Sequence, residues 1–314
     1  MIIGNVRIFS KICLGWAAGQ CRMKEKTMAS ILEKIRDQLA VRWIVLTRPN
    51  PLGWSECLAT SLSRSPAQYA QRRLLRRHVA DPNHPYFDIQ GMRVQYFPPY
   101  TVKDRDYLLR GISQVITESF IFPNFFHGPV QIKSGDIVFD LGGNIGTTAL
   151  LFSKMVGAKG RVFVFEPVMY QTLRDNLREN KIENVEVIAA AVGDRDDQIE
   201  IDVSDFCLDS SIAKREYTAN YYHKAISVPL LRLDSFVAQQ GLKRVNFVKM
   251  DIEGAEELAL RGFKQGLCEL RPQWSISSYH IDFKNELQHP KLIKHLKQYG
   301  YNIAEKRTGH IYAW

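Results

Sequence analysis

Three segments in the second half of the chain carry side chains whose types and spacing could do chemistry. The first is DLGGNIG (140–146), which follows an apolar run and contains three glycines, Gly142, Gly143 and Gly146. Glycines can adopt positive φ and let the backbone approach a ligand closely. Asp140 before the turn and Asn144 within it add polar side chains, which a turn that only presents amides to a pyrophosphate does not need. We expect this turn to bind a ligand, although a glycine turn alone does not identify it.

The second segment is VFVFEPV (162–168), in which Glu166 ends an apolar run 24 positions after Gly142. A carboxylate at such a strand end can accept hydrogen bonds from both hydroxyls of a ribose. Several nucleoside cofactors are held in this way. Glu166 therefore supports nucleoside binding without separating one cofactor from another.

The third segment, NFVKMDIEGAEELALRG (246–262), places Asp251 and Glu253 at another strand end. Either carboxylate could act as a general base. His280 is a further candidate, because it ends the apolar run WSISSYH (274–280) and histidine titrates near neutrality. The Asp251–Glu253 pair alone could hold a divalent ion, but no larger metal-ligand cluster is visible in the sequence, so we expect no metal centre.

Strand and helix patterns alternate over residues 131–314. Apolar runs predict strands over 137–141, 161–166, 185–192, 226–233 and 245–252, and helical periodicity predicts helices over 145–156, 169–180, 235–240, 255–263 and 290–299. The C-terminal segment predicts a hairpin, with strands over 301–306 and 310–314 joined by a turn at Arg307-Thr308-Gly309. We therefore expect an α/β fold with a mostly parallel sheet, helices on both faces and an antiparallel C-terminal hairpin. Ligands of such sheets bind at the carboxyl ends of the strands.

Residues 1–130 differ from the rest in charge. They contain 18 Lys and Arg against 9 Asp and Glu, a net charge of +9, whereas residues 131–314 contain 24 of each (42 − 18 and 33 − 9). Helices are predicted over 31–46, 66–79 and 104–119, and the second carries four arginines, Arg72, Arg73, Arg76 and Arg77. These form either an anion-binding surface or a solvated face. We expect two domains, 1–130 and 131–314, with the basic N-terminal region as a cap or substrate-selecting element.

Composition excludes several classes of protein. A chain of 314 residues with 45% hydrophobic and 24% charged residues is neither wholly disordered nor a membrane bundle. The five cysteines are odd in number and lack CxxC spacing, which favours a reducing compartment over a disulfide framework or a zinc site. Arg7 and Lys11 interrupt the mildly apolar start, so we expect no secretion signal and a cytoplasmic location.

The order of FDLGGNIG, VFVFEP, VIAAAVGD, VPLLRLDSF and FVKMDIEGAE resembles the FkbM family of S-adenosylmethionine-dependent methyltransferases. The resemblance runs from about residue 131 to 279, and its last block is far more specific than the glycine turn. The family usually has alanine where Gly143 stands and an aromatic residue near Thr147. Membership implies a class I methyltransferase fold and transfer of a methyl group, typically to a hydroxyl oxygen of a sugar, a glycan or a small natural product.

The resemblance also assigns roles to residues. Asp140, Gly142 and Asn144, in the turn that also contains Gly143 and Gly146, would hold the methionine end of S-adenosylmethionine. Glu166 would hold the ribose. Asp194 is a candidate for the adenine amino group, or else a turn residue of the segment GDRDD, and 206–225 is either a lid over the acceptor or a surface excursion.

Other functions stay open on the sequence alone. The chain could methylate a nucleic acid or a protein that docks on the basic N-terminal region, although we do not expect a nucleic-acid partner because no aromatic interleaving or nucleic-acid motif accompanies the arginines. It could also bind a nucleoside without catalysis, or use a nicotinamide cofactor. The oligomeric state is not encoded in any pattern that we recognise.

Overall fold

The computed structural model describes residues 54–63, 66–76, 78–79, 86–89, 92–95, 115–116, 129–204, 223–282, 284, 286–306 and 309–314. The predicted helix over 31–46, most of the one over 104–119 and nearly all of the predicted lid (206–225) lie outside these ranges. No helix in the described ranges is long and apolar enough to cross a membrane.

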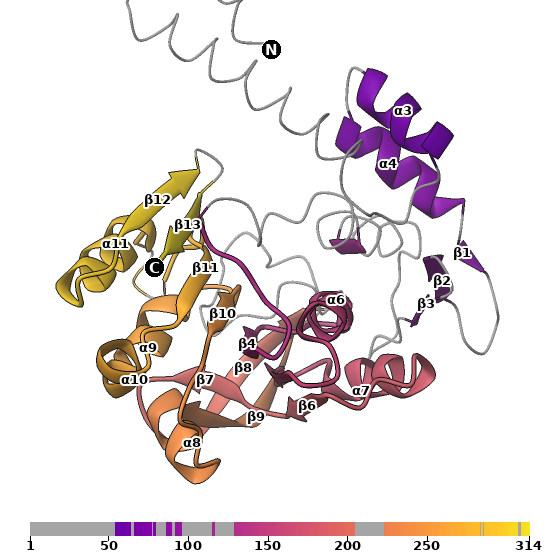
Figure 1. Cartoon of the computed structure of the whole chain (residues 1–314). Coiled ribbons are helices and arrows are strands. Elements are labelled where there is room, and N and C mark those ends of the chain that lie inside the picture. The colour runs from indigo at the N-terminus through magenta and orange to yellow at the C-terminus, as the bar shows by residue number, and fades with distance from the viewer. Residues whose placement is uncertain are drawn as a thin grey trace, which may run out of the picture.

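A seven-stranded sheet is the centre of the fold (Figure 1). Its strand order is β12 (Ile303–Lys306), β13 (His310–Ala313), β11 (Gln273–Ser277), β10 (Phe247–Met250), β4 (Ile137–Leu141), β5 (Arg161–Phe165) and β6 (Val185–Ile188). The five strands from β11 to β6 are parallel, whereas β13 runs antiparallel to both of its neighbours. The mostly parallel sheet and the C-terminal hairpin are therefore confirmed.

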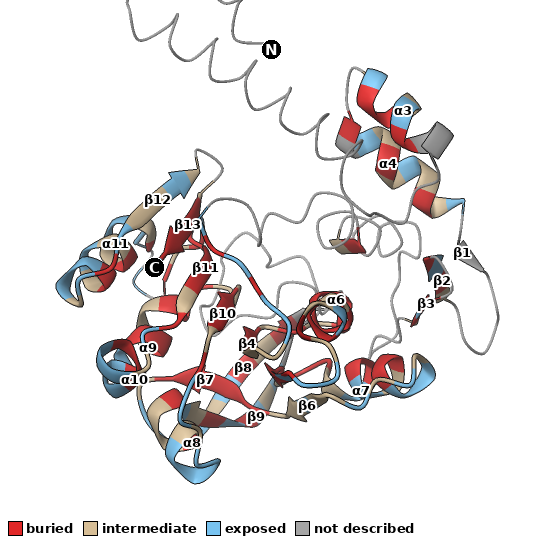
Figure 2. Cartoon of the chain, in the orientation of Figure 1, coloured by how far each residue is buried: buried red, intermediate tan, exposed pale blue. Residues whose placement is uncertain are grey.

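Two apolar cores cover the two faces of the sheet. The first core contains residues of α6 (Thr147–Val156) and α7 (Tyr170–Glu179), together with Cys57, Ala70 and Leu74 from the N-terminal part. The second contains residues of α8 (Leu233–Gln239), α9 (Glu256–Arg261), α10 (Lys264–Glu269) and α11 (His289–Gln298). In β5, Val162 and Val164 belong to the first core, and Phe163 and Phe165 to the second. Successive side chains of a strand face opposite ways. A strand buried on both faces consequently reads as a continuous apolar run. Figure 2 shows β10 buried along its length.

The prediction of one strand over 185–192 is wrong. The Ala190 amide donates to the Ile188 carbonyl (2.9 Å), which ends β6 in a tight turn, and β7 (Ala191–Gly193) joins a second sheet. That sheet has the order β7, β9 (His223–Arg232) and β8 (Asp197–Ser204), so the predicted strand over 226–233 lies outside the central sheet. Strand β8 was not predicted, although its apolar residues Ile199, Ile201 and Val203 alternate with polar ones as in a half-buried strand.

The described N-terminal elements are α3 (Trp54–Leu62), α4 (Pro66–Leu75), β1 (His78–Val79), β2 (Tyr86–Ile89) and β3 (Met92–Gln95). The helix predicted to reach residue 79 is wrong at its end, since β1 pairs with β2 instead. Asn176 of α7 and Asn180, which follows its last residue, hold β3. Asn176 bonds the amide and carbonyl of Gln95 (2.6 and 2.9 Å), and Asn180 bonds those of Arg93 (3.1 and 2.7 Å). The division at residue 130 and the role of 1–130 as a cap stay predictions.

The glycine turn is packed against the end of β10. Gly142 has φ +83°, and a Cβ atom added there would lie 2.0 Å from the carbonyl oxygen of Asp251. Its amide donates to the Phe165 carbonyl at 3.0 Å. Gly142 therefore joins the ends of three strands, and only a residue without a side chain fits.

Comparing the variants Gly142→Ala and Gly135→Ala separates the effect of this steric clash on stability from the effect of backbone strain. Gly135 also has positive φ (+88°), but an added Cβ would meet nothing within 4 Å. We expect Gly135→Ala to lower the free energy of unfolding by about 1–2 kcal/mol through strain alone. Gly142→Ala should lower it by about 1–3 kcal/mol more because the backbone must also move. Urea unfolding measures both, and equal losses would contradict the close approach.

Candidate active site

The sequence-predicted residues gather where the parallel strands end. Chain order reverses between β4 and β10, because the strands that follow β4 run outward on one side and later strands on the other. Ligands of open α/β sheets bind at such a point. A cavity of about 750 Å³, including its open mouth, lies there. Its lining consists of Gly142, Asn144, Phe165, Glu166, Pro167, Val168, Ala190, Ala191, Val192, Ile201, Asp251, Ile252, Glu253 and Ala255.

Glu166 organises the loops around this cavity. Its carboxylate accepts hydrogen bonds from the amides of Asn144 (2.8 Å), Val168 (2.8 Å) and Met169 (2.9 Å). Burial raises the pKa of Glu166 above its ordinary value, although these amides act in the opposite direction. Asn144 has φ +48°, in the left-handed region. The carboxylate thus holds the glycine turn and the loop after β5 together at one wall of the cavity.

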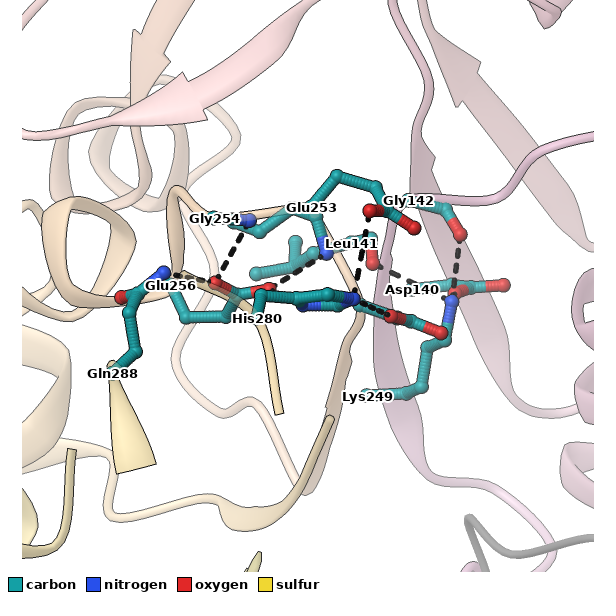
Figure 3. A network of polar contacts seen from close by, with 11 residues as sticks. Asp140, Leu141, Gly142, Lys249, Glu253, Gly254, Glu256, His280 and Gln288 are labelled. Atoms are coloured by element: carbon teal, nitrogen blue, oxygen red, sulfur yellow. Dashed lines mark hydrogen bonds and ion pairs between the residues drawn. The ribbon is translucent and has the colours of Figure 1, made fainter. Parts of the chain in front are cut away.

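Asp140 is buried below this wall and pairs with Lys249, a residue that the sequence motifs do not single out. Asp140 Oδ1 lies 3.1 Å from Lys249 Nζ, and Thr148 Oγ1 donates to Asp140 Oδ2 at 2.5 Å. Lys249 Nζ also donates to the carbonyl of Gly142 at 2.6 Å (Figure 3). Burial raises the pKa of Asp140, while Lys249 and Thr148 oppose that shift. A lysine inside a fully buried strand was the available signal, because an unpaired charge is too costly to bury there.

His280 meets three carboxylates after β11. Its Nδ1 atom lies 2.7 Å from Glu256 Oε1, and its Nε2 atom lies 3.6 Å from both Asp251 Oδ1 and Glu253 Oε2. Burial alone would lower the pKa of His280, but the hydrogen bond and charge of Glu256, with the charges of Asp251 and Glu253, raise it to about 9. The structure therefore brings the three sequence-predicted catalytic candidates together.

Glu256 is not among the residues that the sequence singles out, but the structure gives it a large part in the site. It is fully buried, and its carboxylate accepts hydrogen bonds from the amides of Ile252 (3.2 Å) and Gly254 (3.1 Å) and from Gln288 Nε2 (2.5 Å). It thereby fixes both the loop that carries Asp251 and the imidazole of His280.

Some of the residues predicted to bind the cofactor line the cavity and others do not. Gly142, Asn144 and Glu166 line the cavity, whereas Asp140, Gly143, Gly146 and Asp194 are not among its lining residues. Asp194 Oδ1 pairs with Arg195 at 3.2 Å, and Gly146 caps α6 with φ +93°. The roles of Asp140 toward methionine and of Asp194 toward adenine stay predictions.

Gly143 departs from the family's usual alanine for a visible reason. An added Cβ would lie 2.1 Å from Val164 Cγ1 and 2.8 Å from Leu173 Cδ1. The side chains of Val164 and Leu173 occupy the space that an alanine methyl would need.

The methyltransferase FkbM domain model matches residues 140–303, which is more than half of the chain. The chain belongs to the FkbM methyltransferase family. A curated relative, the 2-O-methyltransferase NoeI of Sinorhizobium fredii, is 26% identical over 151 residues. That alignment covers 44% of this FkbM chain and 62% of the relative, less than two thirds of its length.

Solved structures resemble this FkbM protein at low identity. The FkbM methyltransferase of Methylobacillus flagellatus is 18% identical with a TM-score of 0.44, covering 78% of this chain and 58% of that one. The fibrillarin of Aeropyrum pernix, solved with S-adenosylmethionine, is 16% identical with a TM-score of 0.38, covering 59% and 69%.

S-adenosylmethionine is the cofactor of this family, and the cavity fits it. Glu166 lines the cavity at the end of β5, and its Oε2 atom, which accepts only the Asn144 amide, keeps a lone pair for a ribose hydroxyl. Ala190, Val192 and Ile201 supply an apolar wall that suits a purine ring, and Asp251 adds a buried carboxylate oxygen without a hydrogen-bond partner among the described residues. Apolar lining with few placed polar groups is typical of cofactor sites.

Lys249→Met tests whether the buried pair holds the site together. It leaves Asp140 uncompensated, so we expect the free energy of unfolding to fall by about 3–5 kcal/mol. The double variant Asp140→Asn/Lys249→Met removes both charges and should recover part of that loss. Urea unfolding measures each variant, and a double variant as unstable as Lys249→Met would contradict a mainly electrostatic role.

Proposed function

We propose that this chain transfers the methyl group of S-adenosylmethionine to a hydroxyl oxygen of a sugar, a glycan or a small natural product. One observation carries the proposal: Asp251 and Glu253 line the same cavity as Glu166, so groups able to take a proton stand beside the groups that fit the cofactor. Membership in the FkbM family supports methyl transfer, and the name of the NoeI relative, a 2-O-methyltransferase, supports an oxygen acceptor.

The chemistry divides between cofactor and protein. When bound, the cofactor supplies a methyl group on a positively charged sulfur, which needs no further activation. Gly142, Asn144 and Glu166 would hold it. The protein must then place a hydroxyl group, exclude water and take up the hydroxyl proton. Asp251 and Glu253 are the groups that we assign to the proton, because their side chains line the cavity.

His280 receives a different task. It is 4% exposed and is not among the residues that line the cavity. Its Nδ1 atom is bound to Glu256, as Figure 3 shows, and its Nε2 atom lies 3.6 Å from a carboxylate oxygen of both Asp251 and Glu253. We therefore assign it to positioning the two carboxylates.

Calorimetric titration with S-adenosylhomocysteine tests the cofactor site. We expect binding in preference to NADH. Glu166→Gln should weaken binding roughly 10–100-fold, as the loss of a charged hydrogen-bond acceptor does. Glu186→Gln is the matched control, because Glu186 lies exposed on the next strand and pairs with Arg161. Selective binding of NADH, or no binding by folded protein, would contradict the proposal.

Methyl transfer to a panel of glycosides, phenols and RNA, followed by mass spectrometry, tests the acceptor. With a glycoside or phenol that is methylated, Asp251→Asn and Glu253→Gln should each lower kcat by roughly 10²–10⁴-fold. Affinity for S-adenosylhomocysteine should change much less. Glu257→Gln is the control, since Glu257 pairs with Arg261 at 2.7 Å and does not line the cavity. Methylation of RNA alone would overturn the proposed acceptor class.

A further inference from the structure

We infer that Asp251, Glu253 and His280 form a binding site for a divalent transition-metal ion. This departs from the sequence-based expectation of no metal centre. The role given to the ion below rests on the proposed function, whereas its binding does not.

The spacing of the three side chains is that of ligands around one ion. Each offers one atom, and these atoms lie within 4.8 Å of one another. His280 Nε2 is 3.6 Å from Asp251 Oδ1 and 3.6 Å from Glu253 Oε2, which is too long for a good hydrogen bond. Two atoms each bound at about 2.1–2.4 Å to the same ion are roughly 3–4 Å apart. An ion therefore fits between them with little movement.

Two of the three atoms are buried without a hydrogen-bond partner in the described part of the chain. His280 is 4% exposed, and both its Nε2 atom and Asp251 Oδ1 lack such a partner. Buried polar atoms in folded proteins are nearly always satisfied, so each such atom needs an explanation. One cation between Nε2 and Oδ1 would satisfy both.

The surroundings of the imidazole match those of a metal ligand. A histidine that binds a metal usually donates its other ring N–H to a carboxylate, which fixes the tautomer. Here Nδ1 donates to Glu256, whose carboxylate is held by two backbone amides and Gln288. Because an ionised carboxylate only accepts, Nδ1 keeps its proton, and an ion between Asp251 and Glu253 would replace the proton on Nε2.

The ligand types select the class of ion. Carboxylates suit Mg²⁺, Ca²⁺ and Mn²⁺, whereas imidazole suits transition metals, so two carboxylates with one imidazole favour Mn²⁺ over Ca²⁺. Asp251 and Glu253 also line the cofactor cavity, so an ion that they bind would be reached from it. A cation there would favour the ionised form of an acceptor hydroxyl beside it, and the hydroxyl proton would go to the carboxylate oxygen of Asp251 or Glu253 that the ion does not bind.

Mn²⁺ titration of the chelator-treated full chain, followed by electron paramagnetic resonance of the free ion, tests the site. We expect one tight site per chain, with affinity reduced at least tenfold in Asp251→Asn, Glu253→Gln and His280→Gln. Glu256→Gln should reduce it roughly 10–100-fold, as loss of a carboxylate that orients a ligand does. Glu257→Gln, on the same helix, is the matched control and should bind as the unmodified chain does.

Further measurements keep the outcomes distinct. Circular dichroism establishes folding of each variant, and Glu253→Gln carries the test if the buried variants unfold, because the Glu253 side chain is 23% exposed. S-adenosylhomocysteine binding without a tight Mn²⁺ site would overturn the metal site and leave the proposed function standing. A tight Mn²⁺ site without cofactor binding would do the reverse. An equal loss in Glu257→Gln would show diffuse attraction to acidic residues and overturn the site.

Discussion

The buried ion pair of Lys249 and Asp140 connects the two halves of the sheet. Lys249 lies on β10 and Asp140 on β4, so their contact at 3.1 Å crosses the point at which chain order reverses. Lys249 also binds the Gly142 carbonyl at 2.6 Å and so fixes the start of the glycine turn. Burying two charges is costly unless each is well paired. The pair therefore favours one register between β4 and β10. That register in turn sets where the loops that follow these two strands lie.

Carboxylates with several donors then set the shape of the site above the pair. Glu166 gathers three backbone amides from two loops, and Glu256 gathers two amides and Gln288. Charge-assisted hydrogen bonds of this kind are stronger than neutral ones. Each carboxylate fixes a loop whose residues line the cavity, so the cavity is shaped by its own chain and needs little rearrangement to take a ligand.

Much of this arrangement could be predicted from sequence. Apolar runs located β4, β5 and β10 because those strands are buried on both faces. Asp140, Glu166 and Asp251 could be placed at strand ends from their positions alone. The split after Ile188 could not be predicted, because a single turn hydrogen bond decides it inside a continuous apolar run. The contacts of Lys249 with Asp140 and of Glu256 with His280 could not be predicted either. Each joins segments that are distant in sequence.

Asp251 belongs to both the cofactor cavity and the cluster around His280, and this links the two. Its amide donates to the Leu141 carbonyl at 3.0 Å, while the next amide, that of Ile252, donates to Glu256. The backbone that presents Asp251 is thus tied on one side to the glycine turn and on the other to the carboxylate that orients His280. A shift of either tie would move the Asp251 side chain relative to both the cofactor and the imidazole. Positioning a hydroxyl beside a reactive methyl group tolerates little such movement, because displacement by about 1 Å can cost roughly 10²-fold in rate. These buried hydrogen bonds therefore matter to the chemistry of the site, although their acceptor residues, Leu141 and Glu256, do not line the cavity.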